Sequence, residues 1–342
     1  MTDILKDLGW SNHFATQMPD ATDLTPYRIS EIHRDRMTAL GANGPQTLLT
    51  PGASSGDFAV GDWVLADEQF LVRALLDRQS ILHRRAAGRE AKVQLIAANV
   101  DTLFIVTSCN ADFNTARLER YMALAHDAGA YPVMILTKAD MTDDIGSYER
   151  DAQALDVTMP VLCVNAKDAD DIAKVAAWVK PGQTAALLGS SGVGKTTLTN
   201  GLTGAEAATG AIREDDARGR HVTTSRTLRR MANGGWIIDT PGMRALRLEE
   251  SSEGIDVLYD DIVTLAGQCK FTDCGHDSEP GCAIKAALAS GELAPERLDR
   301  WRKLLAEDNR NTESIAESRA RGKAFGKFIH VTQKDAKKRK GR

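Results

Sequence analysis

The spacing of apolar residues divides the chain into three segments, and the first runs to about residue 88. Its apolar positions form short runs at residues 27–33, 47–50, 62–66 and 70–75, separated by turn-rich stretches at 41–45 and 51–56. Short strands between Gly- and Pro-bearing turns, without a helical period, predict a small antiparallel β-barrel. This pattern does not choose between an OB-fold and an SH3-like barrel.

The second segment alternates between two periods. Continuous apolar runs at 102–106, 133–136, 161–164, 184–188 and 236–238 predict buried parallel strands. Helical patterns at 116–128, 169–179 and 195–202 lie between them. Strands alternating with helices predict a layered α/β domain.

The third segment is mostly helical, with candidate helices at 257–265, 283–290 and 295–309 and one cysteine-rich interruption. We therefore expect three domains, spanning residues 1–88, 89–250 and 251–342.

A phosphate-binding loop follows the apolar run at 184–188. The loop and the start of the next helical pattern read Gly189, Ser190, Ser191, Gly192, Val193, Gly194, Lys195, Thr196 and Thr197. Glycines at this spacing let backbone N–H groups converge on phosphate oxygens at a helix N-terminus. We expect this whole run to contact a nucleotide, with Lys195 at the β- and γ-phosphates and the Thr196 hydroxyl on Mg²⁺.

A second phosphate-side element, Asp239-Thr240-Pro241-Gly242, follows the run at 236–238. Asp239 is expected to hold Mg²⁺ through water. The Gly242 N–H can contact the γ-phosphate, because only glycine permits so close an approach.

The tetrapeptide Thr137-Lys138-Ala139-Asp140, at the end of the run 133–136, is a candidate guanine reader. The Asp140 carboxylate can accept hydrogen bonds from two guanine N–H groups that adenine lacks, and the Lys138 stem can cover the base. Most GTPases carry Asn where Thr137 stands, and a threonine is too short to bridge base and phosphate loop equally well. The lost hydrogen bond costs about 0.5–1.5 kcal/mol. Asn165 and Ala166 are expected to lie against the base.

Residues 210–230 are charged, glycine-bearing and poor in apolar side chains, which predicts a mobile switch loop. Either Thr223 or Thr224 within it can supply the hydroxyl that a switch places on Mg²⁺. Met243 stands where many GTPases have a water-orienting glutamine. His221 is the local candidate for that catalytic role. The alternative is a structural or RNA-facing loop histidine.

Four metal-binding side chains lie close together at Cys269, Cys274, His276 and Cys282. Three thiolates and one imidazole match a closed tetrahedral Zn²⁺ site, which predicts a structural metal. Cys109 and Cys163 lie in or beside apolar runs and are expected to be core thiols.

Charge and hydropathy limit the remaining possibilities. No apolar run is long enough to span a bilayer, so we expect a soluble, cytoplasmic protein without a membrane partner. The net charge is −4, but residues 319–342 hold ten Lys and Arg against one acid. Such a tail is typical of a solvated, nucleic-acid-contacting segment.

The order of the motifs is unusual, because the guanine reader precedes the phosphate loop. The chain resembles the circularly permuted GTPases in this order and in two further features. These are the Gly219-Arg220-His221 motif and the stretch from Cys269 to Glu279-Pro280-Gly281-Cys282. The specific resemblance is to ribosome small-subunit-dependent GTPase A. It departs from the family's usual residues at Val222, usually Thr, and at Thr137, often Asn.

This resemblance implies a multidomain α/β fold: an N-terminal OB-fold, a permuted P-loop GTPase domain and a mostly helical C-terminal zinc domain. It implies hydrolysis of GTP to GDP and phosphate, stimulated by the small ribosomal subunit during that subunit's late maturation, and it assigns His221 to catalysis. The implied cofactors are GTP or GDP with Mg²⁺ and one structural Zn²⁺. The implied partners are the small subunit and its rRNA, with a monomer as the default state.

Two other functions remain open from the sequence. One is an RNA- or ribosome-binding regulator that uses GTP and GDP as a switch with little catalysis. The other is an ATP-using P-loop enzyme such as a kinase, which replacement of Asp140 by Asn would distinguish.

Overall fold

The computed structural model of the protein describes residues 3–19, 23–34, 36–50, 54–85, 93–204, 226–239 and 251–312. The chain divides into two compact units. The first comprises residues 1–246 and 253–260, and the second comprises 247–252 and 261–342.

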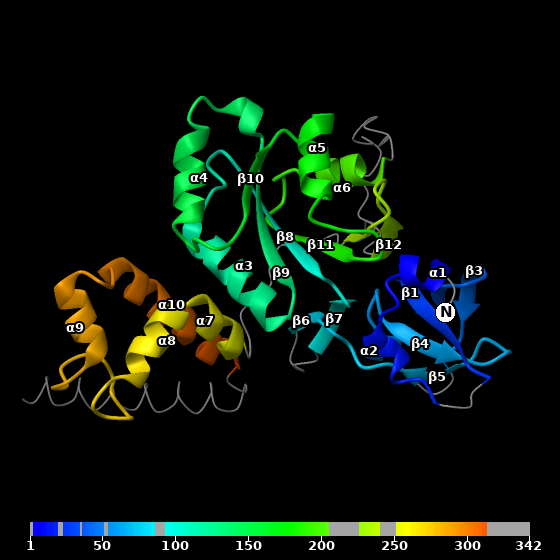
Figure 1. Ribbon diagram of the computed structural model, residues 1–342, viewed down its shortest axis with the longest axis horizontal. Helices are drawn as coiled ribbons and strands as arrows, with labels where there is room; N and C mark the ends of the chain where they lie inside the picture. The colour runs from blue at the N-terminus through cyan, green and yellow to red at the C-terminus, as the bar shows by residue number, and fades with distance from the viewer. Residues whose placement is uncertain are drawn as a thin grey trace, which may run out of the picture. The chain divides into compact units, whose positions relative to one another are not determined.

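A small barrel opens the first unit (Figure 1). Its strands are β1 (Thr25–Ile32), β2 (Met37–Gly41), β3 (Gly44–Leu48), β4 (Trp63–Ala66) and β5 (Val72–Leu75). β1 pairs antiparallel with β2 and β4, β2 with β3, and β4 with β5. A parallel bridge between Leu49 and Leu71 closes the ring. This five-stranded closure is the OB-fold arrangement, so the alternative of an SH3-like barrel is wrong.

Buried side chains from alternate positions fill the barrel, among them Ile29, Ala39, Leu48 and Val64. Two short helices precede it, α1 (Asp3–Asp7) and α2 (Asn12–Ala15), and η1 (Ser55–Asp57) lies between β3 and β4. Trp10 and Phe14 from this N-terminal segment are buried against Trp63 of β4, with ring centroids 4.8 and 5.8 Å away.

A two-stranded antiparallel ribbon follows the barrel, formed by β6 (Ile81–Arg85) and β7 (Val93–Ala98). The sequence pattern did not predict it.

The central sheet contains β8 (Thr102–Ser108), β9 (Tyr131–Thr137), β10 (Val161–Val164), β11 (Thr184–Leu188), β12 (Thr227–Arg230) and β13 (Trp236–Asp239). The spatial order is β10-β9-β8-β11-β13-β12, and the first five strands are parallel. The five predicted parallel strands are therefore confirmed. β12 runs antiparallel to β13, and its Thr227 pairs with Glu31 of β1.

β12 corrects one expectation. Residues 210–230 were predicted to be a mobile loop, yet the last four of them, Thr227–Arg230, form a regular strand. The Leu228 side chain is buried, 7% exposed, whereas the side chains on either side of it in the strand are less buried. The run is too short for this alternation to be distinct in the sequence. Arg226, just before the strand, lies in non-regular structure, and residues 210–225 of the predicted loop lie outside the described residues.

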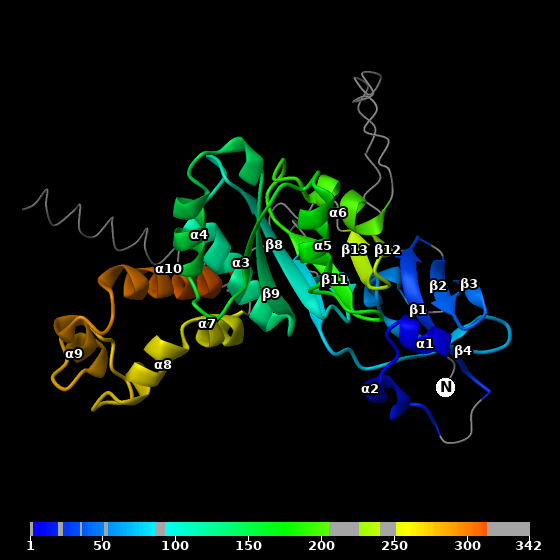
Figure 2. The ribbon, with the colours of Figure 1, turned by 45° about the horizontal axis from the view of Figure 1, so that its top comes forward.

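Helices cover both faces of the central sheet (Figures 1 and 2). They are α3 (Thr115–Asp127), α4 (Ile145–Gln153), α5 (Ala169–Ala176) and α6 (Lys195–Thr203). The 3-10 turn η2 (Ala139–Met141) follows β9, and α7 (Ser252–Leu258) packs on α3, where a Cβ on Gly254 would meet the carbonyl oxygen of Ala123. Side chains of α5 and α6, such as Val175 and Leu198, join Phe104 and Ile135 of the strands in one core. Asn114 and Asp168 cap α3 and α5 by accepting backbone N–H bonds.

The second unit is helical, with α8 (Asp260–Gly267), α9 (Ala283–Ser290) and α10 (Pro295–Thr312). Arg297 of α10 donates to both carboxylate oxygens of Asp261 on α8, at 2.7 and 2.8 Å. The single helix predicted at 257–265 is wrong, because the chain breaks at Tyr259 between α7 and α8. None of the helices in the described ranges is long and apolar enough to cross a bilayer.

Candidate nucleotide and zinc sites

The predicted nucleotide-binding residues meet at one edge of the central sheet. The phosphate loop follows β11, Thr137 ends β9, Asn165 follows β10, and Asp239 ends β13. Because these strands are parallel neighbours, their carboxyl ends share an edge, where open α/β sheets bind ligands. The permuted order of the motifs in the chain therefore assembles a single site.

The phosphate loop is held by close packing at its first glycine. A Cβ on Gly189 would lie 2.1 Å from the carbonyl oxygen of Val106, which leaves no room for any other residue. Gly192 and Gly194 have φ values of 81° and 94°, in the left-handed region that glycine adopts without strain. Val193 is buried in the core, so the loop is anchored from inside. The N-terminus of α6 then begins at Lys195.

Lys195 lies within this loop. Its Nζ donates to the carbonyl oxygens of Gly189 and Ser190 at 2.6 and 2.5 Å. Thr196, the next residue of the helix, is exposed. A cation and a run of helix-terminal N–H groups at one loop suit a polyphosphate.

Asp239 lies beside the start of the phosphate loop. Ile238 pairs with Ala186 of β11, which places Asp239 next to the last residues before Gly189. Asp239 is half-buried. A carboxylate and the Thr196 hydroxyl at one edge are oxygen ligands of the kind Mg²⁺ prefers. Gly242, His221, Thr223 and Thr224 lie outside the described residues.

Thr137 connects the guanine reader to the phosphate loop. Its side chain is buried, 1% exposed, with Oγ1 2.5 Å from the carbonyl oxygen of Val193 and 3.1 Å from that of Thr107. The hydroxyl proton can be donated to one of these oxygens at a time, and the Val193 contact is the shorter. A threonine thus reaches the phosphate loop, a contact that the sequence did not reveal.

The remaining base-side residues surround the ends of β9 and β10. Lys138 has a φ of 58° and is the N-cap of η2, which carries the exposed Asp140. Asn165 and Ala166 are half-buried in the turn after β10. The Asn165 side chain accepts the N–H of Lys167, and Asp171 accepts the N–H of Asn165 at 2.8 Å. These bonds fix the turn before any ligand binds.

The predicted zinc ligands converge in the second unit. The ligand atoms of Cys269, Cys274, His276 and Cys282 all lie within 4.8 Å of one another. Nδ1 of His276 is 3.6 Å from both Cys269 Sγ and Cys282 Sγ, and these two sulfurs are 3.9 Å apart. Tetrahedral Zn²⁺ places two sulfurs about 3.8 Å apart and sulfur and nitrogen about 3.5 Å apart. The four residues therefore fit a structural zinc ion.

Two side chains outside the ligand set hold the loop that carries His276: Glu279, which entered the sequence analysis only as part of the family resemblance, and Arg302. Glu279 accepts N–H bonds from Gly275, Asp277 and Ser278 at 2.8 to 3.0 Å. Backbone N–H groups, its own and those of its neighbours, lower the pKa of Glu279 to about 2. Arg302 donates to the His276 carbonyl oxygen at 3.0 Å.

Cys109 and Cys163 lie apart from this cluster. Cys109 is buried, as the sequence predicted, whereas Cys163 is only half-buried. Burial, with smaller contributions from Glu149 and Cys109, raises the pKa of Cys163 to about 12. Both are protonated thiols of the core near neutral pH.

A model of the RsgA GTPase family matches residues 75–249, more than half of the chain. The chain belongs to the RsgA GTPase family. It is 53% identical over 316 residues to the small ribosomal subunit biogenesis GTPase RsgA of Mesorhizobium japonicum, covering 90% of this chain and 91% of that protein. It is 44% identical to RsgA 2 of Vibrio parahaemolyticus, covering 98% and 94%.

Solved structures share the fold. YjeQ from Thermotoga maritima matches with a TM-score of 0.61 and 22% identity, covering 83% of this chain and 98% of that one. YloQ, described as a circularly permuted GTPase, matches with a TM-score of 0.59 and 22% identity, covering 87% and 99%. Membership of this family makes the chain a GTP-hydrolysing enzyme that uses guanine nucleotide with Mg²⁺.

Proposed function

We propose that this chain hydrolyses GTP to GDP and phosphate in the late maturation of the small ribosomal subunit, and that the subunit stimulates the reaction. Relatives covering nearly the whole chain carry the name of small ribosomal subunit biogenesis GTPases. The observation that carries the nucleotide part is the Thr137–Val193 contact at 2.5 Å. It holds the base reader against the phosphate loop, so one guanine nucleotide can occupy both.

The site residues are assigned on this basis. Asp140 and Lys138 read the base beside Asn165 and Ala166, and the run from Gly189 to Thr197 binds the phosphates. Thr196 and Asp239 hold Mg²⁺, with Thr223 or Thr224 from the switch segment. The Gly242 N–H senses the γ-phosphate.

We assign a separate role to each of the three expected domains. The barrel of residues 1–88 has the OB-fold, which binds single-stranded nucleic acid in many proteins, so we assign it to rRNA. Residues 89–250 carry the nucleotide. Residues 251–342 carry one structural Zn²⁺ and the basic tail, which adds salt-dependent attraction to phosphate backbones. We expect a monomer in the cytoplasm.

His221 is proposed to orient the attacking water, because Met243 cannot do so. The test is turnover of GTP and of ATP by the full chain, with and without small subunits. We expect small subunits to raise GTP turnover and to leave ATP turnover negligible. His221→Ala should lose the stimulated rate while GDP affinity and subunit binding persist, and Val222→Thr should keep it. If small subunits leave the GTP turnover of the native chain unchanged, the proposal is contradicted.

The alternative is a regulator that binds the subunit and uses GTP and GDP only as states. It predicts that His221→Ala leaves turnover unchanged while affinity for the subunit still depends on the nucleotide. The same preparation therefore separates the two functions.

A further inference from the structure

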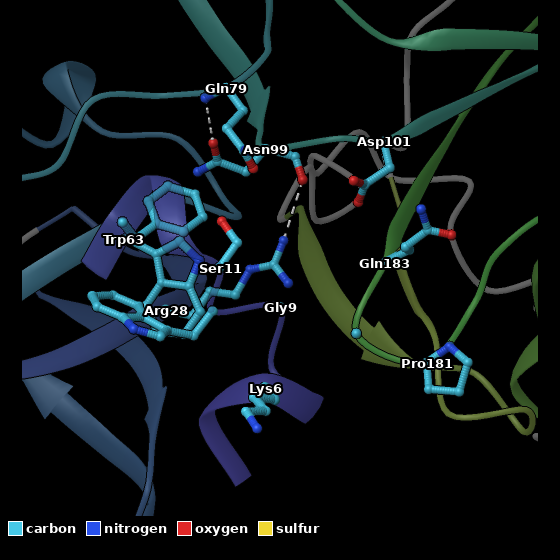
Figure 3. Close-up of a pocket in the computed structure, with 13 residues that line it drawn as sticks. Lys6, Gly9, Ser11, Arg28, Trp63, Gln79, Asn99, Asp101, Pro181 and Gln183 are labelled. Atoms are coloured by element: carbon cyan, nitrogen blue, oxygen red, sulfur yellow. Dashed lines mark hydrogen bonds between the residues drawn. The ribbon is translucent and has the colours of Figure 1, made fainter. Parts of the chain in front are cut away.

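A cavity of about 260 Å³ lies in the first unit, where the N-terminal segment, the barrel and the central sheet meet (Figure 3). Ser11 comes from the N-terminal segment, Arg28 and Trp63 from β1 and β4, and Asp101 and Gln183 from the loops before β8 and β11. The cavity is at the opposite ends of β8 and β11 from the phosphate loop. It is thus separate from the nucleotide site.

Arg28 places a positive charge in the wall of this cavity. It is 2% exposed, and its N–H groups donate to the carbonyl oxygens of Leu8, Gly61 and Asn99 and to Oγ1 of Thr184. All four acceptors are neutral, and no carboxylate among the described residues lies within ion-pair distance of Arg28. Burial lowers the pKa of Arg28 to about 10, although Asp101 and Asp62 act at longer range to raise it. A buried cation without an anionic partner is costly.

Two further polar atoms of the same wall lack a partner. Nε1 of Trp63, whose side chain is 1% exposed, and the buried Oγ of Ser11 make no hydrogen bond with any described residue. Unsatisfied buried donors are rare in folded proteins, because each costs about 1–3 kcal/mol. Here an indole N–H, a hydroxyl and a desolvated guanidinium border one space, and all three can donate.

We propose that this cavity binds a small oxyanion, a carboxylate or a phosphate. The wall supplies donors and positive charge, and an oxyanion supplies the missing acceptors and the missing negative charge. The volume suits a few waters or one small ligand, and it is below the roughly 300–1,000 Å³ of typical drug-sized sites. Asp101, the acidic side chain of the lining, accepts the N–H of Thr184 at 2.7 Å, and burial raises the pKa of its carboxyl.

Binding would also link parts of the unit. Arg28 and Asp101 both bond to Thr184, the first residue of β11, and the phosphate loop follows the last residue of that strand. Leu8 of the N-terminal segment bonds to the same guanidinium at 2.6 Å. An anion on Arg28 would therefore stabilise the contact of the barrel and the N-terminal segment with the strand that leads to the nucleotide.

The test uses the full chain saturated with GDP and Mg²⁺, so that the phosphate loop is already filled. Sodium phosphate and sodium malonate are titrated against sodium chloride at equal ionic strength, with the thermal midpoint and the heat of binding as readouts. We expect at least one of the two anions to raise the midpoint saturably, and the difference between them identifies the source of the oxyanion.

Variants of Ser11 locate the binding. The Ser11 side chain makes no cap bond to α2, so Ser11→Ala should leave the fold unchanged and weaken binding about 2–10-fold, the loss of one hydrogen bond. Ser11→Asp keeps a favourable N-cap residue, and its carboxylate should occupy the place of the anion and abolish the response. Ser147→Ala on α4 is the control, and it should keep the full response to the anion. Absence of a saturable effect for both anions overturns the proposal, and so does an undiminished effect in Ser11→Asp.

Discussion

Thr137→Val tests whether the buried hydroxyl joins the guanine reader to the phosphate loop. Valine nearly keeps the shape of threonine but removes the donor that lies 2.5 Å from the Val193 carbonyl oxygen. The neighbouring strand provides a matched control at Thr107, which is also buried but whose Oγ1 has no partner among the described residues. The same chemical change is thus made with and without a hydrogen bond.

The magnitude follows from burial. Loss of the hydrogen bond with a carbonyl left in a dry site costs about 1–2 kcal/mol, within the range for buried unsatisfied groups. For a domain of roughly 150–250 residues this lowers the thermal midpoint by about 2–8 °C. Because the loop loses an anchor, GDP affinity should fall about 2–10-fold. Thr107→Val removes a desolvated hydroxyl, so its midpoint should stay the same or rise.

The assay is the thermal midpoint of both variants, followed by titration of each with a fluorescent GDP analogue. We expect only Thr137→Val to lose stability and affinity. Equal behaviour of the two variants would refute the reasoning, because the hydroxyl–Val193 contact would then contribute nothing measurable. Loss of stability without loss of affinity would show that the contact supports the fold alone.

Four other changes have defined outcomes. Gly189→Ala should abolish nucleotide binding, because its Cβ would clash with the Val106 carbonyl. Gly192 has no neighbouring atom where a Cβ would lie, so Gly192→Ala should cost only about 1 kcal/mol of backbone strain. Titration of both variants with GDP checks this. Cys282→Ser should release about one zinc equivalent per chain in a colorimetric chelator assay and lower the midpoint of the second unit. Asp140→Asn should reduce the preference for GTP over ATP, measured by competition, only if Asp140 reads guanine. The pKa of Cys163 is raised to about 12, so the folded state keeps a proton that the unfolded state releases from about pH 9. The free energy of unfolding should therefore fall as pH rises between these two values. Cys163→Ala should reduce this pH dependence, which denaturant unfolding measured across the range checks.

Local sequence predicted the parallel strands because each is a continuous apolar run between turn signals. Thr184–Leu188 and Trp236–Asp239 are such runs, and each is followed by a motif with its own chemistry. The cysteine spacing likewise predicted the zinc cluster, because the ligand types alone define the geometry. These features depend on residues close together in the chain.

Features that depend on distant residues could not be predicted in this way. The Leu49–Leu71 bridge, which distinguishes the OB-fold from other barrels, joins two strands whose sequences contain no sign of their pairing. The bond from Thr137 to Val193 spans 56 positions. Arg28 is a charged residue within the predicted short strand at 27–33, and only the fold shows that it is buried and bonded to Thr184.

The pairing of Thr227 with Glu31 has a consequence for dissecting the protein. β12 is the last strand of the GTPase sheet, and its free side would present unpaired N–H and C=O groups to solvent. Strand β1 of the barrel pairs with this side of β12, so the barrel covers the edge of the GTPase sheet. A fragment cut near residue 89 to isolate the GTPase would uncover this margin, and we expect such a fragment to self-associate through it.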